Sequence, residues 1–275
     1  MTTTWQNVQI GGGGWVTGLT ASTTGSAIYA RTDVGGAYAW DGAKNSWRPI
    51  TKSLPNDSAN SGPLEGIGSI AVDPVNAHRV FIAAGTYTYN NPSGIYVPGN
   101  ARAATPTWTA VDATIRVNGK SKGRPFGERL VVDPNNPNIV YYGTNNVSRG
   151  GTGLRRYVYN GSTWAASTVS TPAVGDAGTG ITFVAADKRG GTVAIGWAVV
   201  SKYLYFGVYS NTTGSGGVYA SVDGGQSWSK VTGPAVARPA RSEVDGGGTL
   251  FVTYNGLATG SGGVARIARG SGTSL

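Results

Sequence analysis

The sequence contains no cysteine, and only one histidine and one methionine among its 275 residues. Without cysteine there are no disulfide bonds and no thiol chemistry, although this absence decides nothing about the compartment. His78 is the single histidine, so neither a histidine-dependent catalytic triad nor a histidine-rich metal site can be assembled. No other constellation of metal ligands stands out. We therefore expect no metal and no cofactor.

Charged residues are also scarce, at 13% of the chain, and no stretch is long and apolar enough to span a bilayer. The first five residues, Met1–Trp5, lack the basic and apolar regions of a signal peptide. We expect a soluble chain with no membrane partner, either cytoplasmic or made with a leader that has been removed.

The formal net charge is +9, which makes an acidic partner worth considering. Clustered Lys and Arg side chains attract phosphates, but here they are mostly scattered. The densest group is Arg116, Lys120, Lys122, Arg124 and Arg129. No nucleic-acid-binding motif accompanies this group, so we expect a solvated basic loop and no nucleic-acid partner.

The sequence is rich in Gly (45), Tyr (14), Pro (13) and Trp (8), a composition typical of many short strands and turns. Five segments share one pattern: two apolar strands, a loop, a short strand containing glycine, and a strand containing tryptophan. Four-stranded repeats of roughly fifty residues are the signature of β-propeller blades. The sequence predicts an all-β fold with one propeller domain over residues 1–275 and blades at about 10–51, 66–112, 127–169, 180–233 and 240–270.

The fifth segment stops without its tryptophan strand. Residues Trp5–Val8 have the same character as Trp228–Val231 of the fourth segment, so an N-terminal strand could complete the last blade. We therefore predict five blades closed by residues 4–9. A fragment of a larger propeller would lack the same strand, and this is the alternative. The apolar insertion Val193–Val200 in the fourth segment has no assignment.

Residues Ser221–Trp228 match the Asp-box pattern S-x-D-x-G-x-S/T-W in full. In such a turn the carboxylate, here that of Asp223, accepts backbone N–H bonds while the tryptophan packs between sheets. We therefore expect Asp223 to be structural.

The most informative stretch is Ala30–Trp40, which reads as two strands joined by a glycine turn with Asp33 at the bend. An aspartate before two glycines can simply cap such a turn. Together with Asn7–Gly18, however, this stretch closely resembles the start of the family 74 glycoside hydrolases, the xyloglucanases and oligoxyloglucan reducing-end-specific cellobiohydrolases. The similarity continues through Ser69–Pro74, Ala83–Thr88 and Gly127–Pro134.

Members of that family look like two seven-bladed propellers facing each other across a substrate cleft, in a chain more than twice this length. The resemblance implies an inverting endo-β-1,4-glucanase of xyloglucanase type, an extracellular location and a polysaccharide or oligosaccharide partner. It identifies Asp33 as the catalytic base. The family's general acid is an aspartate of the second propeller, for which this chain has no counterpart. A second propeller chain or an oligomer is therefore a further candidate partner, and part of a seven-bladed propeller is the alternative to the five-bladed ring.

Inversion needs two carboxyl groups roughly 6.5–9.5 Å apart, one to activate water and one to protonate the leaving oxygen. The carboxylates of this chain that could replace the missing acid are Glu65, Glu128, Asp176 and Glu243. Glu128 and Glu65 are the first choices. Glu128 starts an innermost strand, and Glu65 stands near the position of the family's Glu-Ser-Ile-Ala motif. For each of the four, a structural carboxylate bonded to a strand end is the simpler interpretation.

Sugar contacts are expected around equivalent bends of the blades. Aligning the repeats with the bend at Asp33 selects Tyr87, Asn145, Ser210 and Asn255, and the nearest aromatic candidates are Trp15, Tyr38, Tyr89 and Trp40. Hydroxyl, amide and ring groups of this kind suit sugar hydroxyls and pyranose faces, although Trp40 is as readily a packing residue. Three hypotheses follow: a xyloglucanase-type hydrolase, a non-catalytic lectin-like propeller, and a hydrolase fragment without its general acid.

Overall fold

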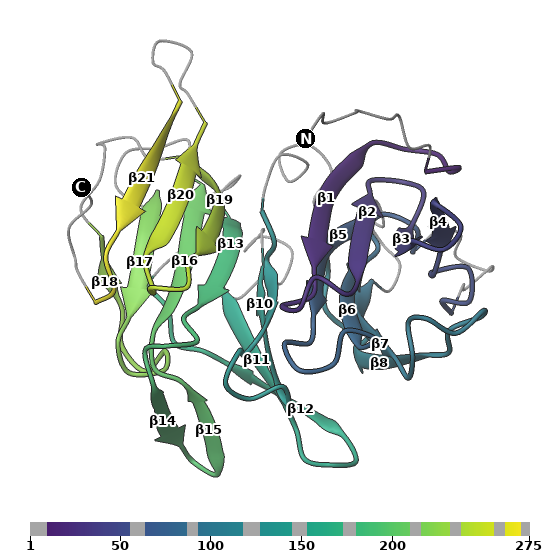
Figure 1. Cartoon of the computed structure of the whole chain (residues 1–275). Helices are drawn as coiled ribbons and strands as arrows, with labels where there is room; N and C mark the ends of the chain where they lie inside the picture. Colours follow the sequence, from purple (N-terminus) through teal and green to yellow (C-terminus); the bar gives the residue numbers. More distant parts are fainter. Residues whose placement is uncertain are drawn as a thin grey trace.

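The computed structural model describes residues 10–55, 64–86, 93–117, 127–144, 153–172, 180–209, 216–231, 238–255 and 262–270. Within these ranges every regular element is a β-strand, and the strands form five antiparallel blades in a ring together with one separate hairpin (Figure 1). The predicted all-β, five-bladed propeller is therefore confirmed. The described residues include no helix that could cross a membrane.

Blades 1 to 3 each contain four antiparallel strands in sequence order. Blade 1 comprises β1 (Val16–Ala21), β2 (Ile28–Thr32), β3 (Ala37–Asp41) and β4 (Ser46–Pro49). Blade 2 comprises β5 (Ile67–Val72), β6 (Val80–Ala84), β7 (Gly94–Pro98) and β8 (Trp108–Asp112). Blade 3 comprises β9 (Leu130–Val132), β10 (Ile139–Gly143), β11 (Leu154–Tyr159) and β12 (Trp164–Thr168).

Blade 4 comprises β13 (Gly180–Ala186), β16 (Leu204–Tyr209), β17 (Gly217–Ser221) and β18 (Ser229–Lys230). Blade 5 has three described strands, β19 (Pro239–Val244), β20 (Leu250–Tyr254) and β21 (Gly263–Ile267). The closing strand that the sequence predicts at residues 4–9 lies outside the described residues.

The apolar runs of the sequence form strands that are buried on both faces. All five residues of β6 are buried. Because side chains alternate along a strand, Val80 and Ile82 enter the core shared with blade 1, whereas Phe81 and Ala83 enter the core shared with blade 3. A strand whose two faces both pack against neighbouring blades therefore needs apolar side chains at every position. This explains why these segments lack an alternation of polar and apolar residues.

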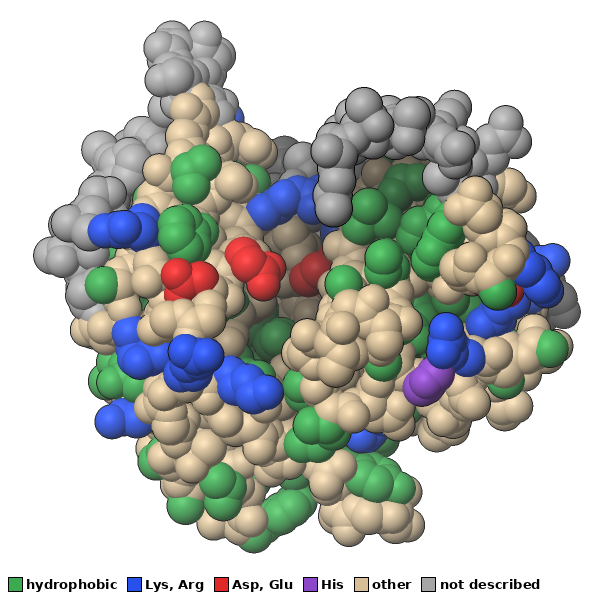
Figure 2. Space-filling view, viewed as in Figure 1, with side chains coloured by type: hydrophobic (Ala, Val, Ile, Leu, Met, Phe, Trp, Pro, Cys, Tyr) green, Lys and Arg blue, Asp and Glu red, His purple; other side chains and the backbone are tan. Residues whose placement is uncertain are grey.

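The seam between blades 5 and 1 has a different character. Arg241 of β19 donates through Nη2 to the backbone carbonyl of Thr17 in β1 at 2.9 Å, which joins the two innermost strands. On the same two blades, Leu19 and Val264 are 63% and 71% exposed. Figure 2 shows a hollow at this place, with basic and acidic side chains around it. Among the described residues, a polar contact therefore joins blades 5 and 1 where the other seams have apolar cores.

The unassigned insertion forms the hairpin β14 (Thr192–Ile195) and β15 (Ala198–Ser201), which projects from the lower end of the propeller in Figure 1. Blade 3 anchors it, because the amide and hydroxyl of Ser201 donate to the two carboxylate oxygens of Asp133 at 2.7 and 2.6 Å. The tip carries Trp197, whose side chain is 70% exposed. This hairpin gives blade 4 an exposed aromatic residue.

Candidate active site

The turn between β2 and β3 holds Asp33 in a defined place. Two hydrogen bonds close the turn: the Thr32 amide donates to the Gly36 carbonyl at 3.0 Å, and the Gly35 amide donates to the Thr32 hydroxyl at 2.8 Å. Gly36 has φ +91°, a left-handed conformation that glycine adopts without strain, and a Cβ atom there would lie 2.2 Å from the Thr51 hydroxyl. The double glycine after Asp33 is therefore a requirement of the turn.

Asp33 is bonded to Trp15 in both directions. The Trp15 amide donates to Asp33 Oδ1 at 2.7 Å, and the Asp33 amide donates to the Trp15 carbonyl at 3.1 Å. The Asp33 residue is 7% exposed, whereas Trp15 is 63% exposed. Gly14 passes close above, since a Cβ atom there would lie 2.7 Å from Asp33 Oδ1. One blade thus presents a held carboxylate and, beside it, an exposed indole ring.

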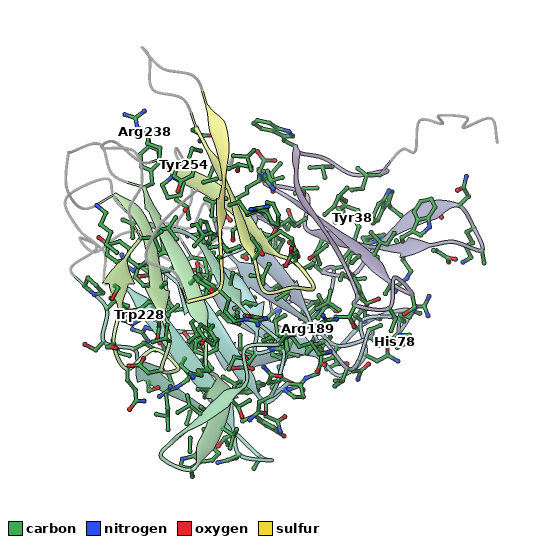
Figure 3. All side chains as sticks on the ribbon, turned by 60° about the vertical axis from the view of Figure 1, so that its left-hand side comes forward. Tyr38, His78, Arg189, Trp228, Arg238 and Tyr254 are labelled. Atoms are coloured by element: carbon green, nitrogen blue, oxygen red, sulfur yellow. The ribbon has the colours of Figure 1, made fainter. Side chains whose placement is uncertain are left out.

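Tyr38 is hydrogen-bonded to the same turn. Its hydroxyl donates to the Gly35 carbonyl at 2.7 Å, and only 4% of the residue is exposed. Burial raises the pKa of Tyr38, and the negative charge of Glu65 raises it further. Figure 3 shows Tyr38 on blade 1, well apart from Tyr254 of blade 5. These contacts support a structural part for Tyr38 rather than the sugar contact expected from the sequence.

Glu65 borders the turn that carries Asp33. Its backbone carbonyl accepts a hydrogen bond from the Gly36 amide at 2.8 Å, and its side chain is close enough to Tyr38 to affect the pKa of that hydroxyl. The residue is exposed. Of the candidate acids that the structure describes, Glu65 is therefore the one at the edge of the Asp33 turn.

Glu128 lies at the propeller axis and uses both carboxylate oxygens. Oε1 accepts from Arg31 Nε at 2.7 Å, while Oε2 accepts from the Ser69 hydroxyl at 2.6 Å and the Ile70 amide at 2.7 Å. The Arg31 side chain reaches it past Gly18, where a Cβ atom would lie 2.6 Å from Arg31 Nε. Glu128 thus links blades 1, 2 and 3, as a structural carboxylate does.

Of the other two candidate acids, only Glu243 is among the described residues. Glu243 lies on β19, and partial desolvation raises its pKa, with no described hydrogen bond or ion pair acting against the shift. Asp176 lies outside the described residues. In the turn Ser221–Trp228, Asp223 Oδ1 accepts from the Gln226 and Ser227 amides, each at 2.9 Å, so its carboxylate serves the local turn.

Most of the sugar-binding candidates at equivalent bends cannot be placed. Tyr87, Tyr89, Asn145 and Ser210 lie outside the described residues. Asn255 directly follows β20 and is exposed. Its backbone amide donates to the Arg238 carbonyl at 3.0 Å. Trp40 is half-buried against Trp47, with ring centroids 5.3 Å apart, as a packing residue would be.

Two arginines are buried against expectation: Arg129, which the sequence predicts in a solvated basic loop, is 1% exposed, and Arg31 was not singled out. Arg31 is 1% exposed in the strand Ile28–Thr32 and also donates to the Thr17 hydroxyl at 2.8 Å. A charged residue inside an otherwise apolar strand is a signal that could have identified it. In the part of the chain that the structure describes, no group of three His, Cys, Asp or Glu residues could hold a metal ion.

On blade 1 of the β-propeller, the structure therefore holds the Asp33 carboxylate next to Trp15, an exposed residue. No protein-family model matches the chain. A xyloglucanase from a Paenibacillus species is 37% identical over 267 residues, which make up 92% of this chain and 24% of that protein. A second xyloglucanase, Xgh74A of Acetivibrio thermocellus, is 34% identical over 91% of this chain and 30% of its own length.

Among solved structures, the GH74 enzyme of Niastella koreensis aligns with a TM-score of 0.76 and 30% identity, over 98% of this chain and 38% of that one. The resemblance to glycoside hydrolase family 74 is therefore confirmed. The chain spans between about a quarter and two fifths of the length of these relatives.

Proposed function

We propose that the chain acts on xyloglucan or a related β-1,4-glucan as an inverting hydrolase, with Asp33 as the base. The observation that carries the proposal is the reciprocal bonding of Asp33 and Trp15, which holds a carboxylate beside an exposed ring. An indole ring suits the apolar face of a pyranose, and relatives at 37% and 34% identity are xyloglucanases. Because such polymers are found outside cells, the proposal also places the protein there.

Asp33 would activate the attacking water. As the water oxygen bonds to the anomeric carbon, its proton passes to the Asp33 carboxylate, and the bond from that carbon to the glycosidic oxygen breaks. The Trp15 amide holds Asp33 Oδ1 at 2.7 Å, so the base need not be oriented when the substrate arrives. Trp15 itself would stack on a neighbouring sugar ring.

The departing oxygen needs a proton, and we assign this role to Glu65. It is exposed and borders the Asp33 turn through the Gly36 amide, whereas Glu128 has both oxygens bonded at the axis. A second propeller, from another chain or from another part of a longer protein, is the other source of an acid that this proposal admits. Either source leaves the role of Asp33 unchanged.

A non-catalytic, glycan-binding propeller is the second candidate. The low exposure of Asp33, at 7%, favours it, since a base must meet a water molecule, while Trp15 would bind sugar in either case. Both candidate functions predict that the protein binds the glucan, but only the first predicts that it hydrolyses it.

The test measures reducing-sugar release from xyloglucan by the wild-type chain, Asp33→Ala and Asp41→Ala. Asp41 is a matched control, because its carboxylate also serves a turn, accepting from the Ala43 and Lys44 amides at 3.2 Å. Wild type and Asp41→Ala are expected to release sugar with inverted anomeric configuration, and Asp33→Ala is expected to lose about 100-fold or more. Binding without release by wild type would show that this chain alone is not a hydrolase, which leaves the lectin-like propeller or an acid supplied by a second propeller. Release that survives in Asp33→Ala would exclude Asp33 as the base.

A further inference from the structure

Arg31 and Arg129 are the two largest fully buried side chains of the described chain, each 1% exposed, but only one has a carboxylate partner. Arg31 pairs with Glu128 at 2.7 Å. The Arg129 guanidinium makes one long hydrogen bond within the described residues, from Nη2 to the Val117 carbonyl at 3.5 Å, and its central carbon lies 5.7 Å from the ring centroid of Tyr142. Its Nε and Nη1 atoms are buried and make no hydrogen bond to the described residues, and neither does the Tyr142 hydroxyl.

Among the described residues, no ion pair joins Arg129 to a carboxylate, and the adjacent Glu128 is already bonded to Arg31 and Ser69. Asp112 already accepts from Tyr157 at 2.9 Å, and it also pairs with Arg155 at 3.5 Å. The stretches that continue from Thr86 and Val117, residues 87–92 and 118–126, contain neither Asp nor Glu. An unbalanced guanidinium in an apolar interior is strongly unfavourable, because arginine keeps its proton.

Backbone hydrogen bonds hold Arg129 in this buried position. Its amide donates to the Ser69 hydroxyl at 2.9 Å, and its carbonyl accepts from the Gly143 amide at 2.8 Å, so it is bonded to blade 2 and to β10. Gly68 leaves room for the side chain, since a Cβ atom there would lie 3.0 Å from Arg129 Nη2. The guanidinium therefore stays between blades 2 and 3.

The surroundings of the Tyr142 hydroxyl are positively charged. Burial raises the pKa of Tyr142, while the positive charges of Arg129 and Arg31 act in the opposite direction. A water molecule can accept N–H bonds but carries no charge, and a neutral glucan carries none either. A small anion meets both needs, because it accepts hydrogen bonds and balances the charge.

We propose that Arg129 and the Tyr142 hydroxyl together hold a small monovalent inorganic anion of the chloride class, buried between blades 2 and 3. The anion accepts from the guanidinium and from the phenolic O–H, and it stabilises the fold because it binds the native chain only. This site is separate from the proposed hydrolytic function, and its test reads stability instead of activity.

The first experiment is thermal unfolding in sodium chloride against sodium gluconate at equal ionic strength. Between about 1 and about 100 mM chloride, the Tm of the wild type is expected to rise by about 5 °C relative to gluconate. Arg129→Met is expected to lose this dependence. Tyr142→Phe, which keeps the cation and the ring, is expected to need about tenfold more chloride for the same shift.

Arg79→Met is the matched control. Arg79 also lies between blades, pairs with Asp73 at 3.1 Å and stacks over Phe81 at 5.0 Å, so its loss should lower Tm without changing the response to chloride. Crystals grown in bromide should show anomalous density beside Arg129. The proposal is overturned if Tm is the same in both salts, if Arg129→Met retains the dependence, or if water alone occupies the place. Should Arg129→Met fail to fold, an unchanged chloride response in Tyr142→Phe overturns the assignment in the same way.

Discussion

Trp15 and Asp33 hold one another through two hydrogen bonds, from the Trp15 amide to Asp33 Oδ1 at 2.7 Å and from the Asp33 amide to the Trp15 carbonyl at 3.1 Å. Both bonds use the Trp15 backbone, so the indole is free to meet a ligand and is 63% exposed. The tryptophan side chain can therefore be removed while the carboxylate keeps its support.

Trp15→Ala is expected to weaken binding of xyloglucan oligosaccharides about tenfold, because a stacked ring is lost while the amide that holds Asp33 remains. Trp197→Ala is the control, since Trp197 is similarly exposed, at 70%, but lies on the hairpin tip of blade 4. Isothermal titration with a soluble oligosaccharide measures both variants. Equal losses in the two variants would contradict a specific role for Trp15.

Glu65→Gln is expected to lower the turnover of xyloglucan by about 100-fold, because glutamine cannot protonate the leaving oxygen. A glycoside whose leaving group needs no protonation should be hydrolysed at nearly the wild-type rate. If both substrates are affected equally, Glu65 is not the acid, and a positional role or another source of the proton must be considered.

Glu128→Gln is expected to destabilise the fold by about 3 kcal/mol, because it leaves the buried Arg31 guanidinium without its charge partner. Urea denaturation should show a lower midpoint with an unchanged slope. Glu65→Gln, at an exposed residue, should unfold like the wild type and serves as the control. A wild-type midpoint for Glu128→Gln would show that the axis does not depend on this ion pair.

Glu243→Gln is expected to act in the opposite direction. Desolvation raises the pKa of Glu243 above its ordinary value of 4.5, so the folded state disfavours the ionised form. The protein therefore loses stability as pH rises from about 4.5 through the folded pKa, and glutamine avoids that loss. At pH 7 the variant should be more stable than the wild type by less than about 1 kcal/mol, because the group is exposed to solvent. Near pH 3 the two Tm values should coincide, and a variant that is more stable at pH 3 alone would contradict this sign.

Local patterns were sufficient for most strands and for the Asp33 turn. The continuous apolar run of β6 and Gly36 of the Asp33 turn both express short-range needs, namely burial on two faces and a left-handed backbone conformation. The hairpin β14–β15 escaped assignment because its Gly196–Trp197 turn lacks the usual Asn-Gly or Asp-Gly signal.

The amino-acid sequence by itself determined the repeat, the all-β propeller and the position of Asp33 in a glycine turn, because each depends on residues close together in the chain. Only the tertiary structure showed which distant residues meet. Arg31 and Glu128 are 97 residues apart and meet at the axis, whereas Glu65 reaches the Asp33 turn through a backbone bond to Gly36. Such pairings depend on how the blades stack around the ring, and no local pattern encodes which side chains will face one another there.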